Sequence, residues 1–184
     1  MNSAQFPDVL IELRMSHISG VGVFAATDIP KGRKVADGIT RQDYKRIVSW
    51  DTYKDLNKTI RDKIKNFCVG TPEGFIPPED NDFNKLSVEW YFNHSCVGNL
   101  RFDEAGDFIA KKAIKIGNEC TYDYALAESN PRFRMKCTCR SPGCRHIITG
   151  DDWRKLSFRE KNLEYMLPSL RLLSQVDRSS READ

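Results

Sequence analysis

The stretch Trp90-Tyr91-Phe92-Asn93-His94-Ser95-Cys96-Val97-Gly98-Asn99 carries most of the information about this fold. It sets a polar run directly after three aromatic residues, in a chain with six cysteines and three histidines. Taken alone, Asn-His-Ser fits an ordinary turn at the end of a strand, because all three side chains can bond nearby backbone groups. Stretches elsewhere in the chain decide between that structural interpretation and a functional site.

Three further stretches matter. They are Gly20-Val21-Gly22-Val23-Phe24-Ala25, Gly117-Asn118-Glu119-Cys120-Thr121-Tyr122-Asp123-Tyr124, and Cys137-Thr138-Cys139 followed by Cys144. In this order, together with the central stretch, they resemble the SET-domain protein-lysine methyltransferases that carry a post-SET zinc-binding segment. The resemblance runs from about residue 20 to residue 144. The combination is far more specific than any single piece.

The resemblance implies a mostly β fold of the β-clip-like SET type. Small curved sheets would enclose a pseudoknot, in which the chain near Asn93 tucks under the segment around Tyr124. We expect the SET domain at residues 1–125 with a helical insert at about 41–68. A post-SET zinc loop at 126–147 and a C-terminal helical extension with a frayed tail at 148–184 would follow.

The composition fits one globular domain, or one domain with a helical appendage. The chain has 184 residues, of which 40% are hydrophobic and 30% charged, and no apolar run approaches the roughly 18 residues of a membrane span. Residues 1–8 lack the basic start and apolar core of a signal peptide. We therefore expect an intracellular protein in a reducing compartment, cytoplasmic or, in a eukaryotic host, nuclear. No membrane partner is expected.

The net charge of +3 is too small to indicate nucleic-acid binding, so we expect no direct binding of nucleic acid. Basic residues are concentrated between Pro131 and His146, where no acidic residue occurs. A solvated loop around a metal site is the preferred interpretation. A docking patch for an acidic protein or a phosphate backbone is the alternative.

Periodicity predicts the remaining elements. We expect strands at 9–13, 21–25 and 120–124 and a hairpin formed by 99–102 and 108–113. One or two amphipathic helices over 42–67, broken near 49–52, and mostly irregular backbone over 70–84 are also expected. In the C-terminal segment, Ser157 and Glu160 fit a capping box. The apolar face of Leu163, Met166 and Leu167, which Pro168 would interrupt, is predicted to pack on the core rather than to bind a partner.

The cysteines of the C-x-C-x4-C pattern supply three thiolates on a tight loop. A structural zinc site has four tetrahedral ligands, so one more must come from elsewhere. The resemblance makes Cys96 the partner of Cys137, Cys139 and Cys144; His146 as the fourth ligand, or three free thiols, are the alternatives. One metal would then hold the C-terminal loop across the site. Cys68 and Cys120 are predicted to be small hydrophobic core residues.

A glycine turn lets the backbone approach a ligand closely. The turn at Gly20 is not a dinucleotide-binding fingerprint, because no third glycine follows and no βαβ unit surrounds it. By resemblance it lies against S-adenosylmethionine, the methyl donor. The cofactor contacts implied are Gly20, Gly22, Val23, Phe24, Asn93 and His94, although His94 could equally be purely structural.

Tyr122 and Tyr124 are two residues apart, so we expect both side chains on one face of a strand. A plain aromatic strand with one packed tyrosine is the alternative. Methyl transfer needs a neutral lysine amine, whose ordinary pKa is about 10.4, so the site must favour the uncharged form. The resemblance assigns catalysis to Tyr124. It makes Tyr122 the position that limits how many methyl groups are added, here favouring monomethyl-lysine.

The chain departs from the family pattern at three places. Val35-Ala36-Asp37-Gly38-Ile39-Thr40 replaces the usual Glu-Tyr-x-Gly-Glu, so one aromatic wall of the lysine channel is not evident. Trp90 stands where arginine is common, and Gly98 replaces a proline, which we expect to affect packing alone. The predicted partner is a lysine-containing protein or peptide, with a histone tail as the leading candidate. A catalytically weak, zinc-stapled peptide-binding module is the alternative function, and a nucleic-acid binder is a third.

Overall fold

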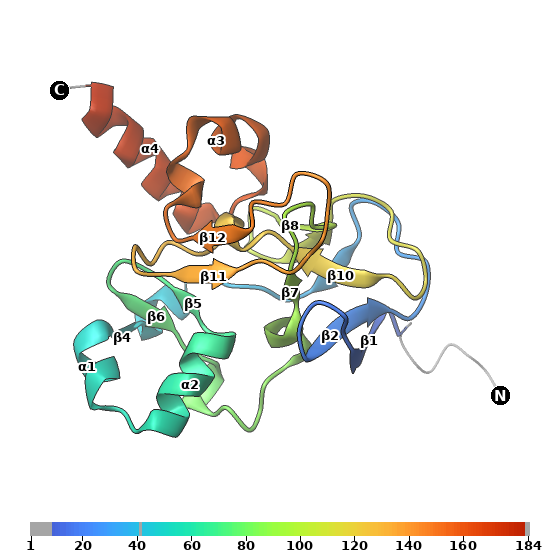
Figure 1. The fold of residues 1–184 in the computed structure, drawn as a ribbon, viewed down its shortest axis with the longest axis horizontal. Coiled ribbons are helices and arrows are strands. Elements are labelled where there is room, and N and C mark those ends of the chain that lie inside the picture. The colour runs from blue at the N-terminus through green and yellow to red at the C-terminus, as the bar shows by residue number, and fades with distance from the viewer. Residues whose placement is uncertain (1–8, 41, 183–184) are drawn as a thin grey trace.

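The computed structural model describes residues 9–40 and 42–182, with the side chains of the last helix described as far as Val176. The expectations for residues 1–8 and for the last two residues lie outside this range. Four small sheets form the body, with helices at two opposite ends (Figure 1). The predicted mostly β fold with a helical insert and C-terminal helices is confirmed.

The main sheet has the order β1 (Ile11–Met15), β2 (Val21–Ala25), β10 (Glu119–Tyr122) and β7 (Asn93–His94). β1, β2 and β10 pair antiparallel, whereas β7 runs parallel to β10. Val23, Ala25 and Cys120 are fully buried at the centre of this sheet. Val23 and Ala25, two residues apart on β2, therefore share the face that packs on the core, and Phe24 between them is only partly buried.

Three smaller sheets surround the main one. They are β3 (Lys34–Ala36), β9 (Phe108–Ala110) and β8 (Leu100–Phe102); β4 (Val48–Ser49), β6 (Gly74–Ile76) and β5 (Val69–Gly70); and β11 (Arg134–Lys136) with β12 (Ile147–Thr149). The hairpin predicted from the sequence is the β8–β9 pair. The segment predicted to be mostly irregular, 70–84, contains only the end of β5, the short strand β6 and the 3₁₀ turn η3 (Glu79–Asn81), so the prediction is confirmed.

The chain crosses itself where β7 passes beneath β10. The Ser95 N–H donates to the Tyr122 carbonyl at 3.0 Å, and the Asn99 N–H donates to the Thr121 carbonyl at 2.9 Å. A Cβ at Gly98 would lie 2.7 Å from the Tyr122 Cα, closer than a side-chain atom can approach. The expected pseudoknot is present, and the glycine at 98 is a requirement of the crossing.

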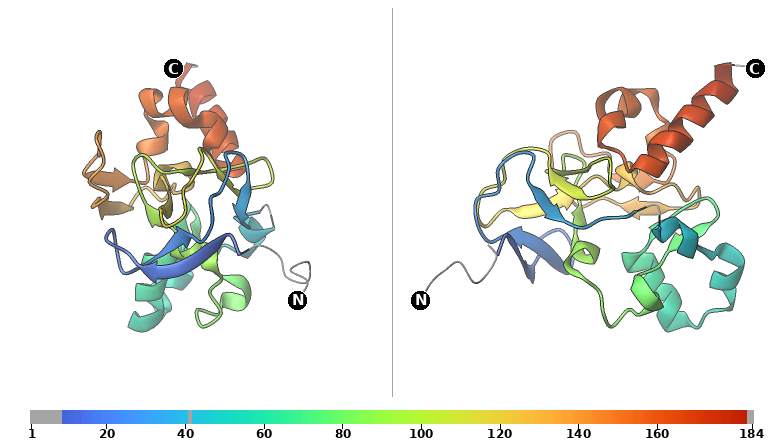
Figure 2. Two further views of the ribbon diagram at one scale, coloured as in Figure 1. Left: turned by 90° about the vertical axis from the view of Figure 1, so that its right-hand side faces the viewer. Right: turned by 180° about the vertical axis from the view of Figure 1, so that it is seen from behind.

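The helical insert starts with the 3₁₀ turn η2 (Asp43–Arg46) and continues after β4 with α1 (Trp50–Asp55) and α2 (Lys58–Phe67). Ser49 caps α1 and Asn57 caps α2, each side chain accepting a backbone N–H three residues ahead. The break predicted near 49–52 is present as the strand β4 at Val48–Ser49, and a second break, which was not predicted, lies at Leu56 and Asn57. The insert lies at the end opposite the C-terminal helices (Figure 2).

The C-terminal segment consists of η6 (Asp152–Arg154), α3 (Leu156–Asn162), η7 (Leu163–Tyr165) and α4 (Pro168–Glu182). The capping box is wrong, because α3 starts at Leu156 with Lys155 as N-cap and no capping side chain. Pro168 starts α4 instead of interrupting a helix, since proline fits the first helical turn. α4 also runs to Glu182, into the tail that was expected to fray.

The packing predicted for this segment is confirmed for Met166 and Leu167 and is wrong for Leu163, which is 40% exposed. Trp153, Met166 and Leu167 are at most 1% exposed and belong to the same core cluster as Val23 and Phe102. The Leu167 N–H donates to the Leu126 carbonyl at 2.8 Å, next to η5 (Tyr124–Leu126). Of the helices that the structure describes, none is long and apolar enough to cross a membrane.

Candidate active site and metal centre

The two tyrosines meet at the end of β10. The strand ends at Tyr122, and Asp123 caps η5 by accepting the Ala125 N–H at 3.1 Å. The expectation that both tyrosines share one face of a strand is therefore wrong, because Tyr124 lies in the turn. The turn still brings the rings together, with centroids 4.9 Å apart.

Both phenols are neutral donors. Burial raises the pKa of Tyr122 and of Tyr124 well above their ordinary values. The Tyr124 hydroxyl donates to the Phe92 carbonyl at 3.0 Å, which fixes its position. The Tyr122 ring packs against Phe102 and Phe108, and its hydroxyl has no hydrogen-bond partner within the described part of the chain. Tyr122 thus offers a free hydroxyl to the cavity that it lines.

That cavity has a volume of about 960 Å³ and is lined by residues of the main sheet, the insert and the strand β11. It is lined by Asn93, His94, Tyr122, Tyr124, Phe133, Met135, Cys68 and residues of the 37–43 segment, among others. Both tyrosines and the Asn-His pair therefore face one space, although they come from sequence positions 28 or more residues apart. Asp37, Gly38, Ile39 and Thr40 also line the cavity. They belong to the segment in which the family pattern has an aromatic residue and this chain has none.

The glycine turn reaches this cavity through the residues just before it. Ile18 and Ser19 line the cavity, whereas Gly20, Gly22, Val23 and Phe24 are not among its lining residues. Val23 is fully buried in the core. Gly20 has a φ of 47°, in the left-handed region that glycine adopts readily. The assignment of these four residues to the cofactor stays a prediction.

At Gly22 the neighbouring side chains leave no room for a Cβ atom. A Cβ there would lie 2.2 Å from the Glu119 Oε1 and 3.0 Å from the Asn93 Nδ2. The Asn93 amide donates to that carboxylate at 2.8 Å and to the Ser19 carbonyl at 3.1 Å. Ser16 donates to the same carboxylate at 2.8 Å. The donor side of Asn93 is thus held inside the protein, which leaves its Oδ1 as the group available to a ligand.

His94 bridges the tyrosine turn and the cysteines. Its Nδ1 accepts the Tyr124 N–H at 3.1 Å, and its Nε2 lies 3.4 Å from the Cys96 Sγ. Burial lowers the pKa of His94 to about 4, so the ring is neutral and carries its proton on Nε2. Both ring nitrogens therefore have partners within the protein. This arrangement supports the structural alternative for the His94 side chain and leaves its backbone available to a cofactor.

Cys96, Cys137, Cys139 and Cys144 bring their sulfurs within 4.8 Å of one another. The Cys96 and Cys137 sulfurs are 3.8 Å apart, which equals the edge of a tetrahedron with Zn–S bonds of about 2.3 Å. The Arg145 N–H points at the Cys96 Sγ at 3.4 Å. Four thiolates with this spacing fit a structural zinc ion. His146 does not belong to the cluster that the described residues form.

The two remaining cysteines differ from each other. Cys120 is fully buried in the core, as predicted. Cys68 is only partly buried and lines the cavity, so the prediction of a core position is wrong for it. Burial raises the pKa of the Cys68 thiol to about 12.

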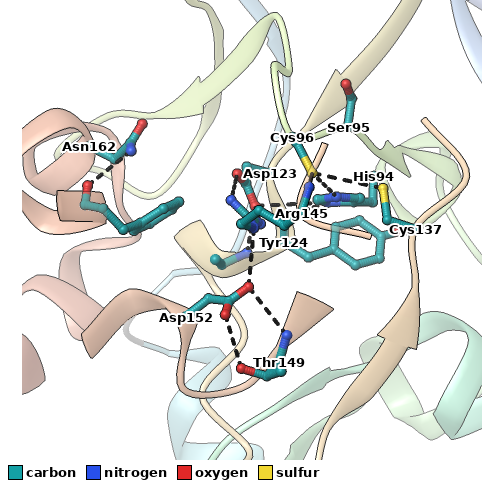
Figure 3. A network of polar contacts seen from close by, with 12 residues as sticks. His94, Ser95, Cys96, Asp123, Tyr124, Cys137, Arg145, Thr149, Asp152 and Asn162 are labelled. Atoms are coloured by element: carbon teal, nitrogen blue, oxygen red, sulfur yellow. Dashed lines mark hydrogen bonds and ion pairs between the residues drawn. The ribbon is translucent and has the colours of Figure 1, made fainter. Parts of the chain in front are cut away.

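An ion-pair network joins the cysteine cluster to the tyrosines (Figure 3). Arg145 binds Asp123 with both terminal nitrogens at 2.6 Å, and its Nε lies 3.2 Å from the Asp152 carboxylate. Asp152 is fully buried and also accepts from Thr149 and Lys155. Bidentate pairs of this type fix geometry as well as charge. Asp123, the residue between the two tyrosines, is thereby tied to the residue that follows Cys144.

The sequence interpretation missed Arg145. The sequence places it in the solvated basic loop, but its side chain is only 22% exposed and forms ion pairs with Asp123 and Asp152. The available signal was an arginine directly after the last cysteine together with an aspartate between the two tyrosines. Arg132, Arg134, Lys136 and Arg140 are exposed, which agrees with a solvated loop.

Comparison with known proteins agrees with this geometry. Residues 20–125 match the SET domain family. The chain belongs to the SET-domain family. Two Drosophila melanogaster relatives, histone-lysine N-methyltransferases ash1 and trr, are each 26% identical, over 78% and 73% of this chain respectively. The aligned region is 6% of the length of each relative.

Among solved structures, this SET-domain chain is similar to the methyltransferase domain of human histone-lysine N-methyltransferase SETMAR. The TM-score is 0.52 at 19% identity, covering 74% of this chain and 56% of that one. At this identity the likeness establishes the fold. The SET assignment itself rests on the match over residues 20–125.

Proposed function

We propose that this SET-domain protein transfers a methyl group from S-adenosylmethionine to a lysine side chain of a protein substrate. The observation that carries the proposal is the convergence of Asn93, Tyr122 and Tyr124 on one cavity, beside four cysteines with tetrahedral spacing. The relatives named as histone-lysine N-methyltransferases support the reaction class. A histone is the leading substrate candidate.

S-adenosylmethionine, when bound, supplies an electrophilic methyl group on a sulfonium sulfur. The Asn93 Oδ1, with its amide nitrogen already engaged, suits a hydrogen-bond donor such as the ammonium of an amino acid. The neutral phenols of Tyr122 and Tyr124 orient the lysine amine, and nearby oxygens stabilise the polarised methyl group through weak CH···O contacts. Aromatic walls exclude water and favour the uncharged amine.

The free hydroxyl of Tyr122 favours monomethyl-lysine as the product. A hydroxyl without a protein partner retains a bound water or the amine itself. Either occupies space that a dimethylated amine would need. This assignment extends the prediction made from the Tyr at this position.

A zinc ion held by Cys96, Cys137, Cys139 and Cys144 would close the post-SET loop over the site. β11 and the residues before it line the cavity, so the loop forms part of the substrate wall. Four thiolate ligands suit a reducing compartment, which supports an intracellular location. The proposed domain division keeps the post-SET loop at 126–147, with the C-terminal segment packed against it.

The test is transfer of labelled methyl from S-adenosylmethionine to a panel of core histones, with Tyr124→Phe beside the native chain. We expect label on lysine of a discrete band and a large loss in the variant. Tyr165→Phe is the matched control, because Tyr165 stacks on Lys111 away from the cavity and should leave the rate unchanged. A zinc-loaded chain that binds no cofactor and labels no band would refute the proposal and favour the peptide-binding alternative.

A further inference from the structure

The mechanism leaves one buried ionisable group unused, the carboxyl of Glu128. The residue follows η5 by one turn, and its N–H donates to the Tyr124 carbonyl at 2.8 Å. Its side chain lines the same cavity as Tyr122 and Tyr124 and is only 5% exposed. A buried carboxylate is costly unless something compensates its charge.

The protein compensates that charge only in part. The Glu128 Oε2 accepts the Gly70 N–H at 2.8 Å, and the Oε1 accepts the Asn130 N–H at 2.8 Å. Each oxygen keeps a second lone pair. Throughout residues 9–40 and 42–176, no cationic side chain forms an ion pair with this carboxylate. Among the described residues, backbone N–H dipoles therefore stabilise the Glu128 carboxylate without the help of a cationic side chain.

Cationic residues such as Arg46 and Lys65 line the same cavity but make no ion pair with Glu128, and the groups on which its charge acts are phenols. Tyr122 from β10 and Tyr44 from η2 feel its charge, Cys68 follows α2, and Glu73 in the β5–β6 turn acts on the same Tyr44. Burial raises the pKa of Tyr44 and of Cys68 to about 12, so neither supplies a charge near neutral pH. A Cβ at Gly70 would lie 2.6 Å from the Glu128 Oε1, so the glycine makes room for the carboxylate.

We propose that Glu128 receives the ammonium group of the substrate lysine and takes the proton that must leave it before methyl transfer. The inference rests on the proposed function and adds a proton acceptor to it. Glu128 presents a buried carboxyl to the cavity without an ion-pair partner among the described residues, and the proposed substrate brings a cation. The acceptor acts directly or through one water molecule.

The proton and electron balance is simple. One N–H bond of the ammonium breaks, its electron pair stays on nitrogen, and an O–H bond forms on Glu128. The lone pair then forms the N–C bond as the C–S bond of the sulfonium breaks, which leaves a neutral thioether and a methylated ammonium. The proton on Glu128 returns to solvent. Burial raises the pKa of Glu128 to about 7, which is suited to a base working near neutral pH.

The experiment is the rate of methyl transfer to core histones as a function of pH, at saturating cofactor, for the native chain, Glu128→Gln and Glu160→Gln. Glu160 is exposed and does not line the cavity, so it is the matched control and should behave as native. The native rate should rise with pH and level off above about 7. Glu128→Gln should be slower by roughly 10²-fold at pH 7 and should recover as the pH approaches about 10, where lysine loses its own proton.

A purely structural role gives a different result. Glu128→Gln would then lower the rate by the same factor at every pH, and that outcome overturns the proposal, as does an unchanged profile. Should the glutamine variant not fold, Glu128→Asp is used instead. We expect its methyl-transfer rate to be lower than the native rate and still to level off near neutral pH. A rate that keeps rising to pH 10 would contradict the proposal. A native chain that labels no histone at any pH while binding cofactor refutes the histone assignment, and this inference with it.

Discussion

The post-SET side and the helical insert both border the cavity, but they are held in different ways. On the post-SET side, Arg145, Asp123 and fully buried Asp152 form one network beside four cysteines. In the insert, α1 buries no residue and α2 buries only Ile64. One wall is therefore fixed by polar and metal-ligating groups, whereas the other depends on local capping and a single apolar anchor. We expect the post-SET side to unfold cooperatively and the helical insert to unfold locally.

The largest effect is expected from Cys96→Ser. Loss of one thiolate removes a ligand from a site whose metal-binding free energy would be part of the folding free energy. We expect loss of bound zinc, loss of methyl transfer and a large drop in thermal midpoint, measured by metal analysis and calorimetry. Cys68→Ala is the control, since Cys68 lies outside the cluster and should keep one zinc per chain.

Arg145→Met should come second. It leaves Asp123 and Asp152 without their shared cation, and breaking a buried pair costs about 3 kcal/mol. Urea unfolding should show this loss together with slower methyl transfer, because Asp123 lies between the two tyrosines. The insert offers the contrast: Lys58→Met removes an exposed ion pair with Asp62 and should leave unfolding unchanged. Equal losses in the two variants would contradict the comparison.

The next largest effect should be the pH dependence of the unfolding free energy. It contrasts Glu128, which has no ion-pair partner among the described residues, with Asp123 and Asp152, which are paired with Arg145. The pKa of Glu128 is about 7 in the folded protein against 4.5 in the unfolded chain. The folded state therefore binds the proton more tightly than the unfolded chain does. The resulting contribution to the unfolding free energy, about 3 kcal/mol, is fully present below pH 4.5 and is lost as the pH rises through 7. Unfolding free energies of native and Glu128→Gln chains from pH 4 to 8 should differ in slope over this window.

The smallest effect belongs to the insert caps. Asn57→Ala removes the side chain that accepts the Ile60 N–H and should cost about 1 kcal/mol. Hydrogen exchange should report the change as faster opening of α2, with amides of the main sheet unaffected. Protection lost equally in β2 and β10 would show that the insert and the body unfold together, contrary to the comparison.

Much of the site could be predicted from the sequence because its parts are short motifs with strong local chemistry. Three of the four clustered cysteines follow from the C-x-C-x4-C spacing, whereas Cys96 and the meeting of Asn93 with Tyr122 and Tyr124 follow from the family resemblance that these motifs carry. The β8–β9 hairpin followed from alternating residues around a turn. These features depend on residue type and order, which a sequence displays directly.

The missed features depend on distant partners. The Asp123 turn ends β10 before the expected strand would end, because its carboxylate caps a turn and binds Arg145. Gly22 is required by Glu119, 97 positions away, and Gly98 by the backbone of Tyr122. The capping box at Ser157 had the right residues, but the packing of Trp153 and Phe158 set the start of α3 elsewhere. No local pattern contains these contacts.

The crossing of β7 under β10 also has a consequence for synthesis. Cys96 leaves the ribosome 41 residues before Cys137, which at about 5–20 residues per second is a wait of about 2–8 s. During that time β10, which covers the β7 segment, is itself still being made. The nascent chain therefore carries the Cys96 thiol before its three partner cysteines exist, and the four-cysteine cluster cannot assemble until Cys144 has been made.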